Sequence, residues 1–292
     1  MPIIELKDVS KLYGFGDATT LALDEISLTI DEGEFVAVMG PSGCGKSTLM
    51  NLIGLLDRPT HGQFVLQGKP VERLRQARRA KIRRDTIGFV FQFFNLLPRL
   101  TVLENVAMPL TYKNVSSRRC IKQAMNMLER VGLTGREFYY PRHLSGGQAQ
   151  CVAIARALIN NPKIIIADEP TGNLDSASSR LVMELLSEIH KTGNTILFVT
   201  HNPELTRYAT RVIYMHDGAV VQDEQTTFGE IAATARKVMY TIPVKTEEDD
   251  LEGVSTLMHA LPNESGGKHT PASKSKKKKA AKTKRRTTRS KK

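Results

Sequence analysis

Tryptophan is absent from this sequence of 292 residues, cysteine occurs three times, and aromatic residues make up 6% of the chain. Cys44, Cys120 and Cys151 form no C-x-x-C pair, which argues against a disulfide scaffold or a zinc site and is typical of a reducing compartment. No stretch approaches the roughly 18 uninterrupted apolar residues of a membrane-spanning helix, and the N-terminus lacks the apolar core of a signal peptide. We therefore expect a cytoplasmic location.

The positive net charge of the whole chain comes from one end. The net charge is +12, but residues 268–292 carry 13 Lys or Arg and no Asp or Glu. The first 267 residues carry 29 basic and 30 acidic side chains, so their summed charge is close to zero. This balance argues against a basic groove for nucleic acid in the folded part.

Three interpretations of the basic run are open. The ordinary one is a solvated tail. The second is attraction to anionic lipid, at ~1 kcal/mol per basic residue close to the membrane surface. Nucleic acid is the third and least favoured, because the run contains no aromatic residue for base stacking.

The length allows one or two domains at about 150 residues each. Beyond Lys237 the apolar pattern weakens, and the last 25 residues have only alanine as apolar residues, too little to offset the entropy of ordering. The sequence therefore predicts three parts: a domain at 1–237, an acidic linker at 238–267 whose Val254, Leu257, Met258 and Leu261 have helical spacing, and a disordered tail at 268–292.

Compact apolar runs alternate with amphipathic segments through the first part. Buried parallel strands are predicted at 35–39, 164–167 and 195–200, and helices at 46–56, 147–159 and 176–191. Such alternation is typical of an α/β fold with a parallel sheet. The segment 93–143 has helical character, and Arg211–Asp223 is predicted to be a hairpin turning at Asp217 and Gly218.

A glycine-rich loop follows the strand 35–39 and fits the pattern G-x-x-x-x-G-K-S. Glycines let the backbone wrap round a phosphate chain, and the amides at the start of the following helix point at it. Lys46 is expected to reach the β- and γ-phosphates and the Ser47 hydroxyl to bind Mg²⁺. The predicted phosphate-binding residues are Gly40, Pro41, Ser42, Gly43, Cys44, Gly45, Lys46, Ser47 and Thr48.

Two carboxylates end the strand that begins at Ile164. Adjacent strand residues point to opposite sides, so one carboxylate can serve a metal while the next reaches a water. We assign Asp168 to Mg²⁺ and Glu169 to polarising the attacking water, which together suit phosphoryl transfer. An ordinary acidic turn is the alternative for the dipeptide taken alone.

A second serine–glycine loop opens onto the helix at 147–159. Its residues Leu144, Ser145, Gly146, Gly147 and Gln148 form an anion site by the same helix-terminus argument, yet the loop has no lysine. A half-site of this kind suggests completion by another copy of the chain.

With these motifs in order, residues 3–235 closely resemble the nucleotide-binding subunit of ABC transporters. The resemblance implies a P-loop ATPase core with a mainly parallel sheet, an N-terminal antiparallel β subdomain and a helical subdomain at about 93–160. It also implies two molecules of ATP between head-to-tail subunits of a homodimer, with Mg²⁺, and a membrane-spanning permease subunit that holds the protein at the inner face of the membrane.

The same resemblance implies roles for residues outside the phosphate loop. Glu169, His201 and Gln92 would be catalytic, with His201 contacting the γ-phosphate and Gln92 contacting both the metal and the water. The metal would be held by Ser47, Gln92 and Asp168. ATP would further be contacted by Tyr13, which stacks on adenine, and across the dimer by Ser145, Gly146, Gly147, Gln148 and Asp175.

Finer similarity narrows the branch. The segments 13–23, 91–98 and 170–176 look like the macrolide-exporter and lipoprotein-releasing branch, with the cell-division ABC ATPase as a close relation and alternative. A soluble ABC ATPase acting on nucleic acid or ribosomes is less favoured, because such proteins usually carry two ATPase units. One departure concerns turnover: the family has Gln-Gln-Gln-Arg where this chain has Gln148-Ala-Gln-Cys151, which removes the arginine's charge and donors.

Overall fold

The computed structural model describes residues 1–14, 19–113 and 115–225. The chain divides into two compact units, Met1–Pro243 and Val244–Lys292. The predicted linker at 238–267 and the predicted tail at 268–292 lie outside the described residues. All that follows concerns the first unit.

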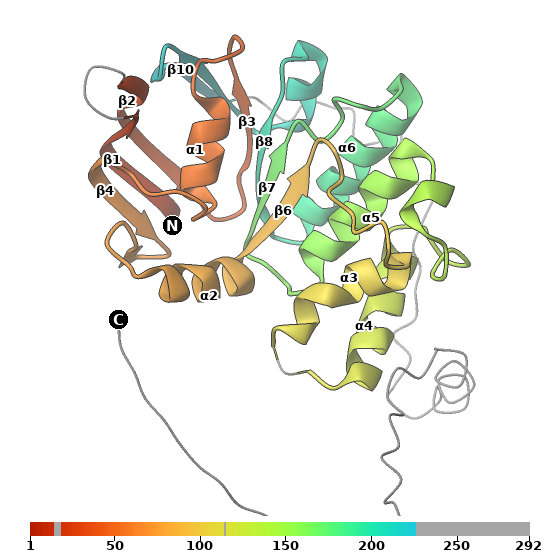
Figure 1. The fold of residues 1–292 in the computed structure, drawn as a ribbon. Coiled ribbons are helices and arrows are strands. Elements are labelled where there is room, and N and C mark those ends of the chain that lie inside the picture. The colour runs from red at the N-terminus through yellow and green to blue at the C-terminus, as the bar shows by residue number, and fades with distance from the viewer. Residues whose placement is uncertain (15–18, 114, 226–292) are drawn as a thin grey trace, which may run out of the picture. The chain divides into compact units, whose positions relative to one another are not determined.

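Strands and helices alternate through the described part of the chain (Figure 1). In chain order they are β1 (Pro2–Tyr13), β2 (Thr20–Asp31), β3 (Phe35–Met39), α1 (Lys46–Ile53), β4 (His61–Leu66), β5 (Lys69–Pro70), α2 (Gln76–Thr86), β6 (Ile87–Phe91), α3 (Val102–Thr111), α4 (Ser117–Arg130), η2 (Pro141–His143), α5 (Gly146–Leu158), β7 (Ile164–Asp168), α6 (Ser176–Lys191), β8 (Thr195–Val199), η3 (Pro203–Tyr208), β9 (Arg211–His216) and β10 (Ala219–Gln225).

The central sheet has the order β10-β9-β3-β8-β7-β6. Its five strands from β9 to β6 pair in parallel, and β10 pairs antiparallel with β9 across the turn at Asp217 and Gly218. The parallel α/β prediction and the hairpin prediction are both confirmed. Since the strands are parallel, the loops that follow β3, β6, β7 and β8 all leave from one edge of the sheet.

A second sheet of order β2-β1-β4-β5 is antiparallel throughout, which confirms the predicted N-terminal β subdomain. The central sheet lies between two apolar layers because its strands alternate sides. Along β3, for example, Phe35 and Ala37 pack into the core formed with α3 to α6, whereas Val36 and Val38 pack with α1 and the antiparallel sheet. Figure 1 shows α3 to α6 gathered on one side.

The helix α6 spans Ser176–Lys191, as its spacing predicts. Leu186 and Ile189 are buried, but Leu181, which has the same helical spacing, is 64% exposed. Val182 and Met183 fill the core instead, because the buried stripe is rotated by one position from the leucine pattern.

The helix α2 is absent from the sequence prediction because it has almost no apolar face. Its eleven residues include five Arg or Lys. Guanidinium groups hold the helix in place: the buried Arg79 donates to the carbonyl of Asp57, and Arg83 Nη1 donates to the carbonyl of Leu55 at 2.9 Å. Hydrogen bonds from charged donors thus replace the apolar stripe that periodicity detects.

Candidate functional site

The glycine-rich loop joins β3 to α1 at the carboxyl edge of the central sheet. Gly43 and Gly45 have φ of +83° and +98°, a conformation that favours glycine. Lys46 is only 8% exposed, and its Nζ donates to the carbonyls of Gly40 at 2.8 Å and Pro41 at 2.7 Å. The loop therefore curls round a buried ammonium group, with the amides at the start of α1 facing the same space.

The antiparallel sheet supports this loop from behind. A Cβ on Gly45 would lie 2.4 Å from the Ala22 carbonyl oxygen. The hairpin turn contributes as well, because Gly218 N donates to the Cys44 carbonyl at 3.1 Å and Asp24 N donates to the Gly218 carbonyl at 2.9 Å. Strand β2 and the β9–β10 turn thus fix the loop from outside its own motif.

Replacing Gly45 by Ala is therefore expected to displace the loop and weaken ATP binding by at least about tenfold, since a positive φ and a backbone clash coincide there. Gly33→Ala is the matched control, because Gly33 has φ of +85° but a Cβ at that position would meet no atom within 4 Å. The control is expected to cost about 1 kcal/mol of stability and leave ATP affinity unchanged. Nucleotide titration and thermal unfolding of both variants measure this, and equal affinities would contradict the clash argument.

Tyr13 is held beside the start of α1. Its hydroxyl donates to Asp57 Oδ2 at 2.7 Å, and the Lys11 ammonium lies 4.7 Å from its ring centroid. Burial, with help from Asp57, raises the pKa of Tyr13. Burial opposes ionisation of Asp57, but hydrogen bonds from Lys11 and Tyr13 outweigh it and lower the pKa of that carboxyl. The ring, 42% exposed, is thereby fixed with its other face available for stacking.

Asp168 ends β7, and Glu169 follows it in a left-handed conformation with φ of +44°. This turn separates the two carboxylates and is one that non-glycine residues seldom adopt. Burial and the neighbouring Glu169 raise the pKa of Asp168, while the Lys46 ammonium opposes them. Lys46 and Asp168 are thus close enough to interact, although β8 lies between their strands.

Glu169 is the point at which three predicted catalytic residues meet. Its Oε1 lies 3.4 Å from Nδ1 of His201, which follows β8. On its other side, a Cβ built on Gly172 would lie 3.2 Å from Glu169 Oε2 and 2.7 Å from Gln92 Nε2. The carboxylate and the amide of Gln92 therefore flank a glycine that has no side chain to separate them.

A cleft of about 230 Å³ opens at this point. Residues of the turn after β7, the start of α6 and the turn after β8 line it, among them Glu169, Gly172 and His201. The exposed fraction of His201 is 69%, against 26% for Glu169, so the carboxylate lies at the inner end and the imidazole at the mouth.

The loop at 144–148 stands at the start of α5, with Ser145 as its N-cap. Ser145 Oγ accepts from Gln148 N at 3.3 Å, and Gln148 Oε1 accepts from Ser145 N at 3.0 Å, a capping box. Gly147 packs so closely on the start of α6 that a Cβ would lie 2.9 Å from Ser178 Oγ. Gly146 lies close to Phe94 and Leu174, in the segments that follow β6 and β7, whereas the phosphate loop follows β3.

Asp175 is the N-cap of α6 and accepts hydrogen bonds from Ala177 N, Ser178 N and Ser178 Oγ at 2.7–3.0 Å. These bonds, above all those from Ser178, lower the pKa of Asp175. The carboxylate therefore stays ionised and fixed at the surface, next to Gly147.

The comparisons with known proteins agree with this arrangement. The family model described as "ABC transporter" matches residues 23–172. An ABC transporter ATP-binding protein of Methanocaldococcus jannaschii is 53% identical over 222 residues, which is 75% of this chain and 98% of the relative. The chain belongs to the ABC transporter family. As an ABC ATPase domain it binds and hydrolyses ATP with the fold predicted from the sequence.

Other relatives of this ABC ATPase include an exporter protein and a solved dimeric cassette. The macrolide export ATP-binding/permease protein MacB of Hyphomonas neptunium is 48% identical over 76% of this chain, which spans only 34% of that relative's length. The dimeric post-hydrolysis structure of the cassette MJ0796 with ADP and Pi is 46% identical with a TM-score of 0.71, over 76% of this chain and 98% of that one.

A third solved structure, cbiO1 of Clostridium perfringens, is described as part of the transporter complex cbiONQ. It is 31% identical with a TM-score of 0.69, over 77% of this chain and 88% of that one. Across residues 1–14, 19–113 and 115–225, none of the helices combines the length and apolarity needed to cross a bilayer.

Two residues that sequence reasoning gave no role connect α5 of the ABC ATPase to this site. Gln150 is fully buried, and its Nε2 donates to the carbonyl of Pro170, next to Glu169, at 2.6 Å and to that of Phe91, next to Gln92, at 3.4 Å. Arg156 donates to the carbonyls of Phe94 and Asn95 at 2.8 and 2.6 Å. The only signal for these contacts in the sequence is that two polar residues interrupt a largely apolar helical segment.

Cys151, which stands where the family has arginine, lies on the same helix. Burial raises the pKa of the Cys151 thiol to about 11, so the group stays protonated near neutral pH and is a poor nucleophile. The position therefore behaves as a small apolar one in this ABC ATPase, and the contacts of Gln150 form beside it without an arginine.

Proposed function

We propose that this chain is the ATP-hydrolysing subunit of a membrane export or mechanotransmission complex of the MacB type, and that two copies act together. The observation that carries the proposal is the meeting of Glu169 with both Gln92 and His201, at the same sheet edge as the buried Lys46. Phosphoryl transfer needs little beyond positioning and charge stabilisation, and these groups supply both.

Each residue has a defined task. Lys46 exchanges its bonds to the loop carbonyls for phosphate oxygens, and the amides from Gly43 to Thr48 bind the same chain. Glu169 accepts a proton from the attacking water, which Gln92 orients. His201 stabilises the γ-phosphate from the mouth of the cleft.

Ser47, Gln92 and Asp168 offer a hydroxyl, an amide oxygen and a carboxylate, the hard oxygen donors that suit Mg²⁺. Asp168 fits this task because its carboxylate is half-buried, and burial without a cation disfavours the charged form. Bound there with ATP, Mg²⁺ neutralises charge that develops on the phosphates.

The second copy completes the site. Ser145 and Gly147 present a helix N-terminus without any cation of their own, and Asp175 is fixed beside them. We infer that this surface binds the γ-phosphate held by the opposite subunit. The dimeric cassette with ADP and Pi that resembles this chain supports the idea.

The similarity to MacB supports a permease as partner. Phe93, directly after Gln92, is 72% exposed, so an apolar side chain is available for a partner next to the residue that we expect to orient the water. A partner bound there would move Gln92 directly.

Affinity purification from detergent-solubilised membranes tests this function. The expected partner is a membrane-spanning protein whose presence raises the ATPase rate. A division defect on depletion, rather than drug sensitivity, would favour the cell-division alternative, and recovery of ribosomes or nucleic acid alone would contradict the proposal.

Tyr13 tests the adenine assignment. Removing the ring in Tyr13→Ala is expected to weaken ATP binding by about 1–3 kcal/mol, the usual contribution of aromatic–base stacking. Tyr13→Phe keeps the ring and loses only the bond to Asp57, so its affinity is expected to stay within a few-fold of the native value. Isothermal titration of both variants measures this; equal losses would assign Tyr13 to loop stability instead.

A further inference from the structure

The near-zero charge of the folded part hides a strong segregation of charge. Residues 57–160 carry 18 Lys or Arg and 6 Asp or Glu, whereas residues 1–56 and 161–225 together carry 8 basic and 17 acidic side chains. A summed charge close to zero thus conceals one basic region and one acidic region.

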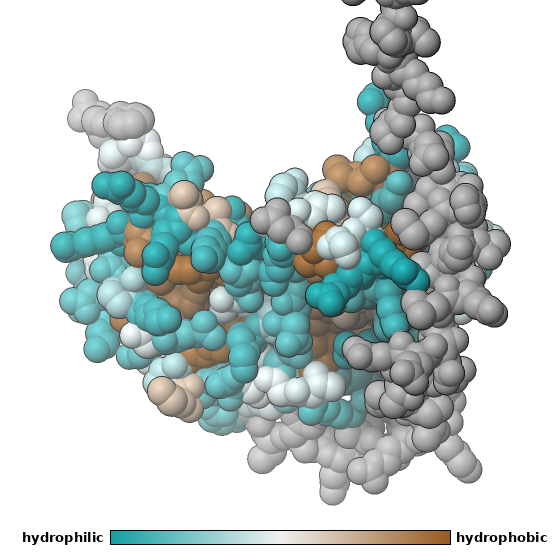
Figure 2. Space-filling view, turned by 90° about the horizontal axis from the view of Figure 1, so that it is seen from below, coloured by the Kyte–Doolittle hydropathy of each residue, from teal (hydrophilic) through white to brown (hydrophobic). Residues whose placement is uncertain are grey.

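The basic region has an exposed face on two helices. Among the exposed basic side chains of this region, six on or next to these helices form no ion pair with a described residue. We call these six the basic face: Arg75, Arg78 and Lys81 on or next to α2, and Arg118, Arg119 and Lys122 on α4. Figure 2 views the molecule from the side of α2 and shows hydrophilic residues over much of it.

The end of α2 and the α3–α4 connection are joined directly. Arg84 Nη1 donates to the Tyr112 carbonyl at 2.9 Å, and Lys113 Nζ lies 3.6 Å from Asp85 Oδ1. The side chain of Tyr112 is 68% exposed at this junction. The end of α2 is therefore tied to the connection that leads into α4, and an exposed tyrosine lies at this junction.

The clustering opposes folding. On the same helix, burial lowers the pKa of Arg79, and the nearby charges of Arg58 and Arg83 lower it further. Like charges gathered on one face cost stability unless something of opposite sign binds there.

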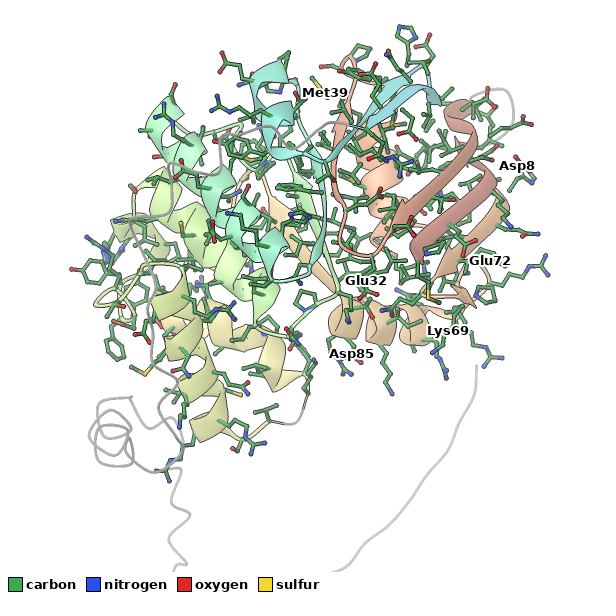
Figure 3. All side chains as sticks on the ribbon, turned by 180° about the vertical axis from the view of Figure 1, so that it is seen from behind. Asp8, Glu32, Met39, Lys69, Glu72 and Asp85 are labelled. Atoms are coloured by element: carbon green, nitrogen blue, oxygen red, sulfur yellow. The ribbon has the colours of Figure 1, made fainter. Side chains whose placement is uncertain are left out.

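The basic face lies away from the ATP site. The helix α2 leads into the first residue of β6, and Gln92 follows the last, so about 17 Å of strand separates the two ends. Figure 3 shows the same separation along the sheet: Met39, which precedes the phosphate loop, lies at the opposite end from Glu32 and Asp85.

We propose that the basic face binds the headgroups of an anionic phospholipid bilayer. Two helices present several separate cations, which suit a field of headgroups, and tyrosine is typical of the bilayer interface. The face has one exposed aromatic residue rather than a series on which bases could stack. The preference for lipid over nucleic acid also rests on the proposed function, which places the protein beside a membrane.

Vesicle binding by the full chain tests the proposal. Arg75, Arg78, Arg118 and Arg119 are all replaced by Gln in one variant and all by Lys in the matched control. Vesicles of equal parts phosphatidylcholine and phosphatidylglycerol are expected to bind the Gln variant at least about tenfold more weakly than the native chain. The Lys control keeps every charge and is expected to bind within about threefold of it.

The 13 basic residues of 268–292 are common to all three proteins, so the difference reports the basic face alone. Unchanged ATPase activity in solution shows that the Gln variant is folded; if it is not, Arg118→Gln with Arg119→Gln on α4 alone replaces it. Equal vesicle binding by native chain and Gln variant would overturn the proposal. The proposal would also be overturned if the Gln variant lost binding to a DNA duplex but still bound vesicles like the native chain, because the face would then be assigned to nucleic acid. The vesicles contain no permease, so these results are independent of partner purification.

Discussion

Replacing Glu169 by Gln is expected to lower the rate of ATP hydrolysis by about 10²–10⁴-fold while ATP binding is retained, the usual contribution of a positioned general base. The amide keeps the size of the carboxylate, so the left-handed turn and the placing of this side chain and Gln92 on either side of Gly172 remain. It cannot accept the proton of the attacking water. We therefore expect a nucleotide-dependent dimer to accumulate, measurable by gel filtration with ATP.

A substitution at the neighbouring Gly172 tests whether the position of Gln92, as well as the Glu169 carboxylate, is needed for turnover. Gly172→Ala keeps the Glu169 carboxylate but inserts a Cβ 2.7 Å from Gln92 Nε2 and 3.2 Å from Glu169 Oε2, so it crowds the amide more than the carboxylate. If Glu169 is the base and Gln92 orients the water, this variant also loses turnover without losing ATP affinity. Native turnover in Glu169→Gln would remove Glu169 from the role of base.

The positions of these residues could be predicted from the sequence for one physical reason. Buried parallel strands are short apolar runs, and their carboxyl ends meet at one edge. The runs that end at Met39, Asp168 and Val199 are such strands, so whatever follows them is brought together. The proximity of Glu169 to His201, and of Asp168 to Lys46, follows from that arrangement.

Contacts between distant segments could not be predicted in the same way. Gly45 lies so close to Ala22 that a Cβ there would clash with the Ala22 carbonyl. Gln150 donates to the carbonyls of Pro170 and Phe91. Both contacts join segments that share no periodicity in the sequence. The helix α2 was not predicted from the sequence for a related reason: arginine–carbonyl bonds hold it in place where an apolar stripe would be expected. Polar contacts leave no repeating pattern in a sequence.

Replacing Ser145 by Asp is expected to abolish the ATP-driven dimer while the monomer binds ATP normally. Aspartate is as good an N-cap as serine and suits the positive end of α5, so the helix keeps its stability. In the proposed dimer, however, the new carboxylate faces the γ-phosphate of the opposite subunit. Two unit charges 4 Å apart repel by about 4 kcal/mol at an effective dielectric constant near 20, which corresponds to a loss of roughly a thousandfold in each shared site.

Asparagine at position 145 is the matched control, because it is nearly the same size as aspartate, caps a helix equally well and carries no charge. Ser145→Asn is therefore expected to retain ATP-dependent dimerisation and most of the ATPase rate, and the two variants should unfold at similar temperatures. Sedimentation with and without ATP measures the dimer. If Ser145→Asp weakened ATP binding to the monomer, Ser145 would belong to the site of its own subunit, and the two-copy arrangement would be wrong. If both variants failed equally, the Ser145 hydroxyl itself, rather than charge, would decide closure.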